Sequence, residues 1–366
     1  GGSGIVIVRY PTNGLNAPPS YVDTSAMDTF AVATGSFAGA DVDANTTLTY
    51  GISGGTTASG VVSKVGTYGT LAITASTGAY NFTPNAAAIN ALSTSTTETF
   101  EVTVSDTTAI TTALYTVSVT GVNDAPVNTV PGAQSVAEDT VLAFSGNTAI
   151  SVADVDGNLA SVGLMVTNGT LAVTLGTTGA TISAGANNSA TVTLAGTAAQ
   201  INAALATLVY QGTLHFSGSD TLTVVSTDSA GTPLADTDTV AITVTAVNDA
   251  PTLAAIPVKG ASGTLLSFTA ADFTGAFTDV DGTALSSITV TTLPATGILK
   301  LSGSAVTINQ VVAAADLANL TYEPVAGAIG ARTFTVTASD GTAASAAATV
   351  TMTLAYFVGI ICKCGF

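Results

Sequence analysis

Residues 240–251 read Val-Ala-Ile-Thr-Val-Thr-Ala-Val-Asn-Asp-Ala-Pro. The first six alternate apolar side chains with Ala or Thr at a period of two, which is typical of a β-strand with one buried face. The last four form a short polar hinge. The segment therefore predicts a strand that closes one domain and a hinge that leads into the next.

This hinge recurs, and each copy is followed about 25 to 30 residues later by an Asp-x-Asp pair. The hinges are Asn16-Ala17-Pro18, Asn123-Asp124-Ala125-Pro126 and Asn248-Asp249-Ala250-Pro251, and the pairs are Asp41-Val42-Asp43, Asp154-Val155-Asp156 and Asp279-Val280-Asp281. A pair of motifs that recurs in fixed order at this spacing indicates tandem domains.

Other segments show the same alternation as residues 240–245. They are residues 100–104, 114–120, 221–225, 333–337 and 348–354. Clusters of Gly, Asn, Asp and Ser separate such segments every eight to twelve residues, which is the spacing of turns in a β-sandwich. We therefore expect an all-β chain of three tandem β-sandwiches in an elongated array.

The hinges set the expected boundaries of these domains. We expect a Gly-rich lead with an apolar strand in residues 1–16, sandwiches in residues 17–125, 126–250 and 251–354, and an apolar tail in residues 355–366. Two short helices are predicted at matching places, residues 198–208 and 310–320. The first has Ile201, Leu205 and Leu208 on one face, so it can cover an edge of the core.

The two ends depart from the repeat. The strand Ile5–Val8 has no evident partner in the repeat scheme, so it is either the remnant of a neighbouring domain or a device for assembly with another molecule. We assign no mechanism to Cys362 and Cys364 in the tail. Because the chain begins with Gly, we expect a processed product or a piece of a longer protein.

The composition excludes some partners. The net charge of −17 comes from 19 Asp and 4 Glu against six Lys and Arg. Nucleic acid is excluded as a partner, since little in the chain could neutralise phosphates. No apolar run reaches the roughly 18 residues that a membrane span requires. One explanation of the acidity is solubility alone.

A second explanation is cation binding. Short Asp side chains in turns supply the oxygen ligands that calcium prefers, and empty carboxylate clusters would repel one another. Each domain also carries an Asp in the turn before its final strand, namely Asp106, Asp228 and Asp340. The competing interpretation is that these Asp residues only form turns.

Catalytic groups are scarce in the sequence. His215 is the single His, so neither a His-dependent triad nor a typical zinc site can be built. Glu98 and Glu101 are three residues apart on a strand and point to opposite faces, which makes them a poor acid/base pair for glycoside hydrolysis. We therefore expect that the protein is not an enzyme.

The first domain resembles the VCBS repeat of large bacterial surface proteins, and the other two resemble the bacterial cadherin-like, or Ig-like, repeats of the same adhesins. The motifs that carry the likeness are residues 66–71, 77–84 and 121–126 for the first domain, and Val136-Ala137-Glu138-Asp139-Thr140, Leu208-Val209-Tyr210 and Leu320-Thr321-Tyr322 for the others. The likeness covers roughly residues 17–354.

The resemblance implies calcium bound between successive modules. It implies Asn123, Asp124, Asp154, Asp156 and Asp228 as ligands at the first junction, Asn248, Asp249, Asp279, Asp281 and Asp340 at the second, and a weaker set of Asp41, Asp43 and Asp106 in the first copy. The hinges lack the leading Asp and one Asn of the cadherin linker, so we expect one ion per junction.

The resemblance further implies an extracellular protein on a bacterial cell surface. We expect a calcium-stiffened stalk or repeating body of an adhesin, fibre or surface layer, with neighbouring repeats or other copies as partners. One alternative is a filament or sheath subunit whose N-terminal strand completes a sheet in the next molecule. Another is a carbohydrate-binding module that recognises surface glycans, although Tyr80, Tyr210 and Tyr322 fall in strands where core packing is expected.

Overall fold

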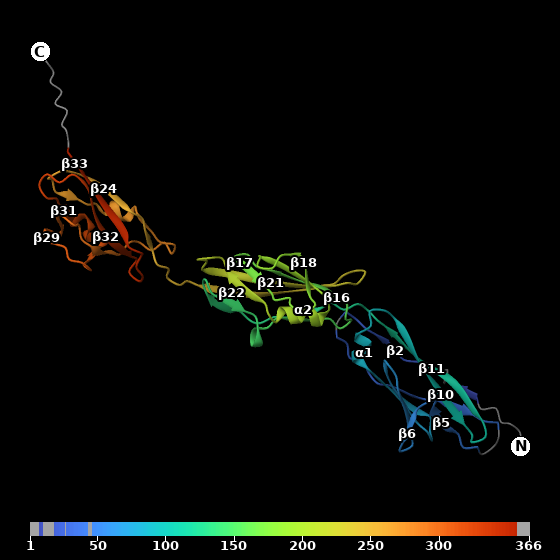
Figure 1. Ribbon diagram of the computed structural model, residues 1–366. Coiled ribbons are helices and arrows are strands. Elements are labelled where there is room, and N and C mark those ends of the chain that lie inside the picture. Colours follow the sequence, from blue (N-terminus) through green and yellow to red (C-terminus); the bar gives the residue numbers. More distant parts are fainter. Residues whose placement is uncertain (1–6, 10–17, 26, 43–45, 357–366) are drawn as a thin grey trace, which may run out of the picture. The chain divides into compact units, whose positions relative to one another are not determined.

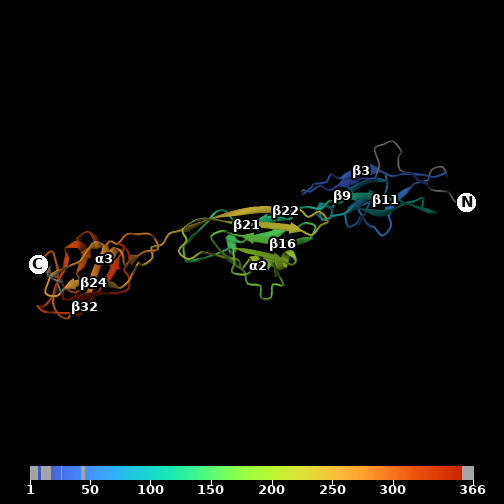
Figure 2. The same ribbon diagram turned by 90° about the horizontal axis from the view of Figure 1, so that it is seen from above.

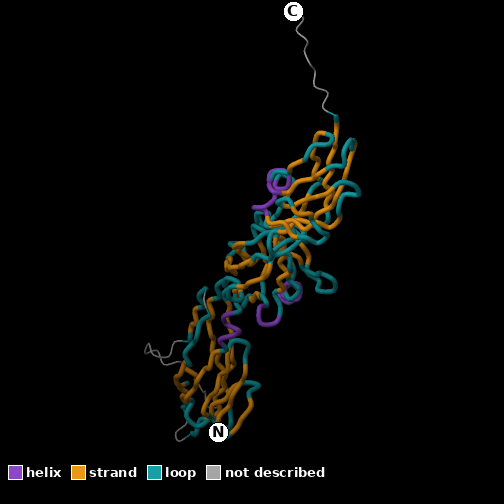
Figure 3. Tube along the Cα trace, turned by 90° about the vertical axis from the view of Figure 1, so that its left-hand side faces the viewer, coloured by secondary structure: helices purple, strands orange, loops and turns teal. Residues whose placement is uncertain are grey.

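The structure is a computed structural model that describes residues 7–9, 18–25, 27–42 and 46–356. Strands make up most of it and the helices are short, as Figures 1 and 3 show. The prediction of an all-β fold is confirmed. None of the helices in this part of the chain has the length and apolar character needed to cross a bilayer.

The chain divides into two compact units, residues 1–244 and 245–366. The first unit contains two hydrophobic cores, one built from residues between Tyr21 and Val119 and the other from residues between Phe144 and Val244. The second unit contains one core, built from residues between Ile256 and Leu354. The exact domain boundaries stay a prediction.

The first core lies between two sheets. Their strand orders are β2-β11-β10-β5 and β3-β9-β8-β7-β6. The strands are β2 (Ser20–Val22), β3 (Ala33–Ser36), β5 (Thr49–Ile52), β6 (Thr56–Ala58), β7 (Val61–Val65), β8 (Gly69–Thr74), β9 (Ala79–Pro84), β10 (Thr96–Ser105) and β11 (Ile110–Thr120). In the β10/β11 pair Phe100 lies opposite Tyr115, and both are buried, so the period-two alternation places apolar side chains inward.

The second core is likewise enclosed by two sheets, with strand orders β13-β22-β21-β16-β19-β18 and β14-β20-β17, and a third, two-stranded sheet pairs β12 with β15. The strands are β12 (Val127–Thr129), β13 (Gln134–Ala137), β14 (Val141–Ala143), β15 (Ser151–Ala153), β16 (Leu159–Met165), β17 (Gly169–Ala172), β18 (Thr181–Gly185), β19 (Thr191–Ala195), β20 (Val209–Gly212), β21 (Gly218–Asp228) and β22 (Ala235–Thr245).

The second unit repeats this arrangement. Its sheets have the orders β24-β33-β32-β27-β30, β25-β31-β28-β29 and β23-β26. The strands are β23 (Thr252–Leu253), β24 (Ile256–Ala261), β25 (Leu266–Ser267), β26 (Phe277–Thr278), β27 (Ser287–Thr292), β28 (Ile298–Leu301), β29 (Ser304–Ala305), β30 (Val311–Ala313), β31 (Leu320–Glu323), β32 (Gly330–Ser339) and β33 (Ala348–Ala355). All six segments predicted from alternation lie within strands.

The helices match the predictions in part. The predicted helix at residues 198–208 is α2 (Ala198–Leu205), with Ile201 and Leu205 buried; Figures 1 and 2 show it close to β16. The predicted helix at residues 310–320 is wrong in its first part, because β30 precedes a 3₁₀ helix, η2 (Ala314–Asn319). The structure adds α1 (Ala86–Asn90), α3 (Ala270–Thr274) and the 3₁₀ helix η1 (Gly146–Thr148).

The N-terminal strand has a partner within its own chain. Residues 7–9 form β1 (Ile7–Arg9), which pairs antiparallel with β4 (Ala38–Ala40). In the other two sandwiches the corresponding partner strands, β12 and β23, follow their hinge. The expectation that this strand has no partner within the repeat scheme is wrong for residues 7–9, while residues 5 and 6 lie outside the described residues.

Candidate metal centres

Strand pairing places the first full hinge beside its Asp-x-Asp motif. Strand β12 runs antiparallel to β15, with Val127 opposite Ala153. Continued three residues beyond β12, this register puts Asp124 opposite Asp156. The main-chain N–H of Asp124 donates a hydrogen bond to Asp156 Oδ2 at 2.7 Å.

The second unit contains the same arrangement. Thr252 of β23 lies opposite Thr278 of β26, so Asp249 comes opposite Asp281. The N–H of Asp249 donates to Asp281 Oδ2, again at 2.7 Å. The recurring order of hinge and Asp-x-Asp pair is therefore the sequence form of a two-strand ladder.

The turn Asp joins the same cluster through the hinge Asn. Asp228 Oδ2 accepts from Asn123 Nδ2 at 2.7 Å, and Asp340 Oδ2 accepts from Asn248 Nδ2 at 2.9 Å. The structure thus brings together Asn123, Asp124, Asp156 and Asp228 in the first unit, and Asn248, Asp249, Asp281 and Asp340 in the second.

The other carboxylate oxygen of each turn Asp stabilises the turn itself. Asp228 Oδ1 accepts from the N–H of Ala230 at 3.0 Å, and Asp340 Oδ1 accepts from Ala343 at 2.7 Å and Thr342 at 2.5 Å. These donors, with Ala343 the strongest, hold the pKa of Asp340 below its usual value. The competing interpretation of these residues as turn formers is therefore correct for one oxygen of each.

Several oxygens in the first unit are buried without a hydrogen-bond partner. They are Asp23 Oδ1, Asp124 Oδ2, Asp154 Oδ2, Asp156 Oδ1 and Asn158 Oδ1. The Asp23 side chain is 1% exposed and Asp124 is 4% exposed. Buried polar atoms in proteins almost always have a partner, so five such oxygens near one hinge indicate that a ligand rich in positive charge belongs there.

The acidic groups raise one another's pKa. Burial, and next the carboxylates of Asp23 and Asp156, raise the pKa of Asp124 to about 6. Burial is also the main cause that raises the pKa values of Asp23 and Asp154. Charge repulsion of this kind disfavours the ionised cluster without a counter-ion.

The donor set fits a hard cation. Every unpartnered atom is a carboxylate or amide oxygen, which is the ligand type of calcium, and no thiolate or imidazole is among them. Calcium takes about six to eight oxygens, so main-chain carbonyls or water would complete the shell. In the second unit Asp279 Oδ2 is the corresponding unpartnered atom.

Sequence reasoning missed three members of the first cluster, Asp23, Asp28 and Asn158. Asp23 and Asp28 come from the loop after β2, and both raise the pKa of Asp124. Asn158 Nδ2 donates to Asn123 Oδ1 at 2.7 Å. The one available signal was proximity in the chain, since Asn158 stands two residues after Asp156, while nothing in the repeat marks the loop of Asp23.

The first copy differs from the other two. Its Asp43 and its hinge residue Asn16 lie outside the described residues. Asp106 Oδ1 accepts from the N–H groups of Thr108 at 2.7 Å and Ala109 at 2.6 Å, and these donors lower its pKa. Asp41 follows β4, whose partner β1 precedes the hinge, so the ladder that joins Asp124 to Asp156 is not built from this hinge.

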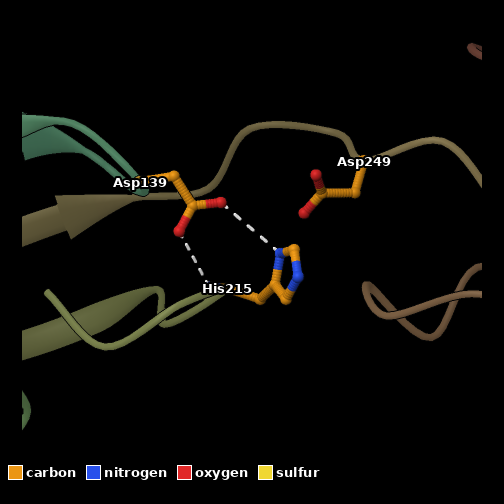
Figure 4. A group of neighbouring side chains, drawn as sticks. All are labelled: Asp139, His215 and Asp249. Atoms are coloured by element: carbon orange, nitrogen blue, oxygen red, sulfur yellow. Dashed lines mark hydrogen bonds and ion pairs between the residues drawn. The ribbon is translucent and has the colours of Figure 1, made fainter.

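His215 takes part in a separate contact. Figure 4 shows the Asp139 carboxylate directed at His215, whose N–H donates to Asp139 Oδ1 at 2.9 Å and whose Nδ1 lies 3.4 Å from Asp139 Oδ2. Both residues have positive φ, 59° and 56°. The pair ties two turns of the second sandwich together, so His215 has a structural contact that its sequence context did not suggest.

Aromatic side chains lie mainly inside the sandwiches. Tyr80, Tyr210 and Tyr322 are 6%, 0% and 0% exposed, as predicted. In the described part of the chain, Tyr356 is the one aromatic side chain that is largely exposed. No platform of aromatic rings for a sugar is therefore found among the described residues.

Comparison with known proteins places the third sandwich in a family. Residues 248–353 match a family model described as a bacterial Ig domain. That segment begins at the second full hinge and ends within β33. A search of curated proteins finds no match.

Solved cadherin structures are similar over most of the chain at low identity. Cadherin domains 1–5 of protocadherin gamma B2 match with a TM-score of 0.37 and 14% identity, covering 92% of this chain and 59% of that one. For domains 21–23 of human CDH23 the values are 0.39, 14%, 91% and 96%. For domains 1–4 of Drosophila N-cadherin they are 0.30, 14%, 94% and 74%. The chain thus spans about three fifths of the protocadherin structure.

Proposed function

We propose that the protein is a non-enzymatic extracellular structural or adhesive protein, a calcium-stiffened stalk or repeating body of a bacterial adhesin, fibre or surface layer. The observation that carries the proposal is the set of five buried, unpartnered oxygens around Asp124. A packed protein leaves such atoms only where something else satisfies them.

Each residue has a part in this proposal. Asp154 and Asp156 present carboxylates from the end of β15, and Asp124 presents one from the hinge. Asp23 adds a carboxylate from the first sandwich, where its N–H is held by Thr120 O at 2.9 Å. A bound calcium would supply the positive charge that these groups lack. Oxygens from the first sandwich, the hinge and the second sandwich would then be fixed to one another.

The second unit supports a repeated device. Its hinge and Asp-x-Asp motif have the same ladder contact as the first unit, and Asp279 Oδ2 is unpartnered. The match of residues 248–353 to a bacterial Ig domain supports an exterior, bacterial setting. The proposed domains are residues 17–125, 126–250 and 251–354.

Calorimetry of the full chain tests the proposal. We expect calcium at millimolar concentration to raise the unfolding temperature relative to metal-stripped buffer, with a dissociation constant of about 10⁻⁴ to 10⁻³ M, as in other extracellular modules. Magnesium at equal ionic strength is the control, because it prefers smaller octahedral sites. Identical unfolding in calcium and in metal-stripped buffer would refute calcium stiffening.

A further inference from the structure

The loop that carries Asp23 and Asp28 is held by one buried amide. Asn90, the last residue of α1, is 2% exposed. Its Oδ1 accepts from the N–H of Asp28 and its Nδ2 donates to the carbonyl of Asp28, both at 3.1 Å. The side chain thus pairs with the main chain of Asp28 as a neighbouring strand would.

This pairing extends to Asp23. Asp28 Oδ2 accepts from the N–H of Thr24 at 2.6 Å, which closes the turn between the two acidic residues. Thr24 directly follows Asp23, whose Oδ1 is one of the unpartnered buried oxygens. A shift of Asp28 away from Asn90 would therefore move the turn that orients Asp23.

The opposite side of the cluster is held in the same way. Asn202 of α2 accepts from the N–H of Val152 and donates to its carbonyl, both at 2.9 Å. Val152 is the central residue of β15, which leads directly into Asp154. The other edge of β15 pairs with β12, where Asn128 lies opposite Val152. β15 is thus fixed on one side by the hinge strand and on the other by α2.

A third amide makes the same contact away from the acidic cluster. Asn187 accepts from the N–H of Val173 and donates to its carbonyl, both at 2.9 Å. Among the described residues, no hydrogen bond or ion pair joins Asn187 or Val173 to the acidic side chains. This third contact therefore shows what an amide of this kind contributes to stability alone.

We propose that Asn90 and Asn202 are positioning residues for the cation site, so that the two short helices α1 and α2 hold its two halves in register. The inference rests on the proposed calcium function and deepens it. It assigns a role to α1 and α2 that lies outside the repeated Asp motifs. The residues touch no ligand oxygen themselves and act through the main chain of Asp28 and Val152.

Three matched variants test the proposal, Asn90→Ala, Asn202→Ala and the control Asn187→Ala. Each is made in the full chain with Asp279→Asn and Asp281→Asn, which weaken the second site so that the first dominates. Calcium affinity is measured by isothermal titration calorimetry, and the unfolding temperature is measured in metal-stripped buffer. Asn90→Gln, which keeps the amide but moves it by one methylene, replaces Asn90→Ala if that variant does not fold.

We expect all three variants to lower the unfolding temperature, because each exposes a paired N–H and C=O to loss of their partner. Only Asn90→Ala and Asn202→Ala should weaken calcium binding, by about 10-fold or more, as is usual for residues that orient metal ligands. Calcium affinity equal to that of Asn187→Ala would overturn the positioning role. Absence of calcium binding by the parent chain would instead refute the proposed function, and the inference with it.

Discussion

Asp124 and Asp156 face each other across the extension of a two-strand ladder, with the N–H of Asp124 donating to Asp156 Oδ2 at 2.7 Å. The same contact joins Asp249 to Asp281 at the same distance. Because Asp156 Oδ2 is used by the hinge, Asp156 Oδ1 is left for a ligand. One carboxylate therefore both fixes the hinge and serves the site.

Asp156→Asn should weaken calcium binding at the first junction. The amide oxygen can still accept from the Asp124 N–H, but one negative charge is lost from the cluster. We expect calcium affinity to fall by about 10-fold or more, as seen when groups around a metal are altered, when measured by isothermal titration calorimetry. Asp238→Asn on β22 makes the same charge change as a control and should leave the affinity unchanged. An equal fall in both variants would point to net charge rather than to a site.

The stability of the metal-free protein should fall as pH rises from about 4 to about 6. The pKa of Asp124 is raised to about 6, so in this window the folded chain holds a proton that the unfolded chain has released, and folding weakens as the proton leaves. The raised pKa values of Asp23 and Asp154 act in the same direction. Asp106 and Asp340 have lowered pKa values and act below this window.

Urea denaturation at several pH values in metal-stripped buffer measures this trend. Asp124→Asn should flatten it, since the neutral amide does not titrate. With saturating calcium the trend should reverse, because protons then compete with the ion for the carboxylates. Stability that rises with pH in metal-stripped buffer would contradict the prediction.

Tyr210→Phe should destabilise the second sandwich by about 1.5 to 3 kcal/mol, the range for a hydrogen bond to a charged group. The Tyr210 hydroxyl donates to Asp220 Oδ2 at 3.0 Å inside the core, and burial together with Asp220 raises the pKa of Tyr210. Tyr356→Phe, at a position 65% exposed, is the control and should change the unfolding free energy by less than about 0.5 kcal/mol. Equal effects of the two variants in urea denaturation would count against the buried contact.

Leu205→Ala should cost about 2 to 5 kcal/mol, the usual range for a cavity in a core. Leu205 is 0% exposed and belongs to the core between Phe144 and Val244. Hydrogen exchange should show lost protection in that segment and unchanged protection between Ile256 and Leu354, which belong to a different core. Leu214→Ala, at a position 70% exposed, is the control. Loss of protection in both cores would mean that they unfold together.

The all-β fold could be predicted because one signal, the period-two alternation, marks each long strand. The helix at residues 198–205 was also recognisable, since its apolar residues share one face, and Thr197 and Gln200 cap it reciprocally. Helices α1 and α3 have five residues each, too few to establish a period of 3.6. At residues 311–313 the apolar run favoured a helix, but pairing with β27 made it a strand.

The candidate site was predictable where it repeats and not elsewhere. Asp124 and Asp156 stand in motifs that recur, so comparison of the copies found them. Asp23 and Asn158 enter the cluster through tertiary packing, and Asn90 acts from 62 residues away in sequence. Such contacts leave no local periodicity, and a single sequence contains no signal for them.

The pairing of β1 with β4 changes where the first sandwich can be cut. An expression fragment that starts at Pro18, the apparent boundary, would lack β1 and leave the N–H and C=O groups of β4 exposed along an open edge. Such edges recruit strands from other molecules and promote aggregation. A recombinant first sandwich should therefore include residues 7–9, which come before the motif that marks its start.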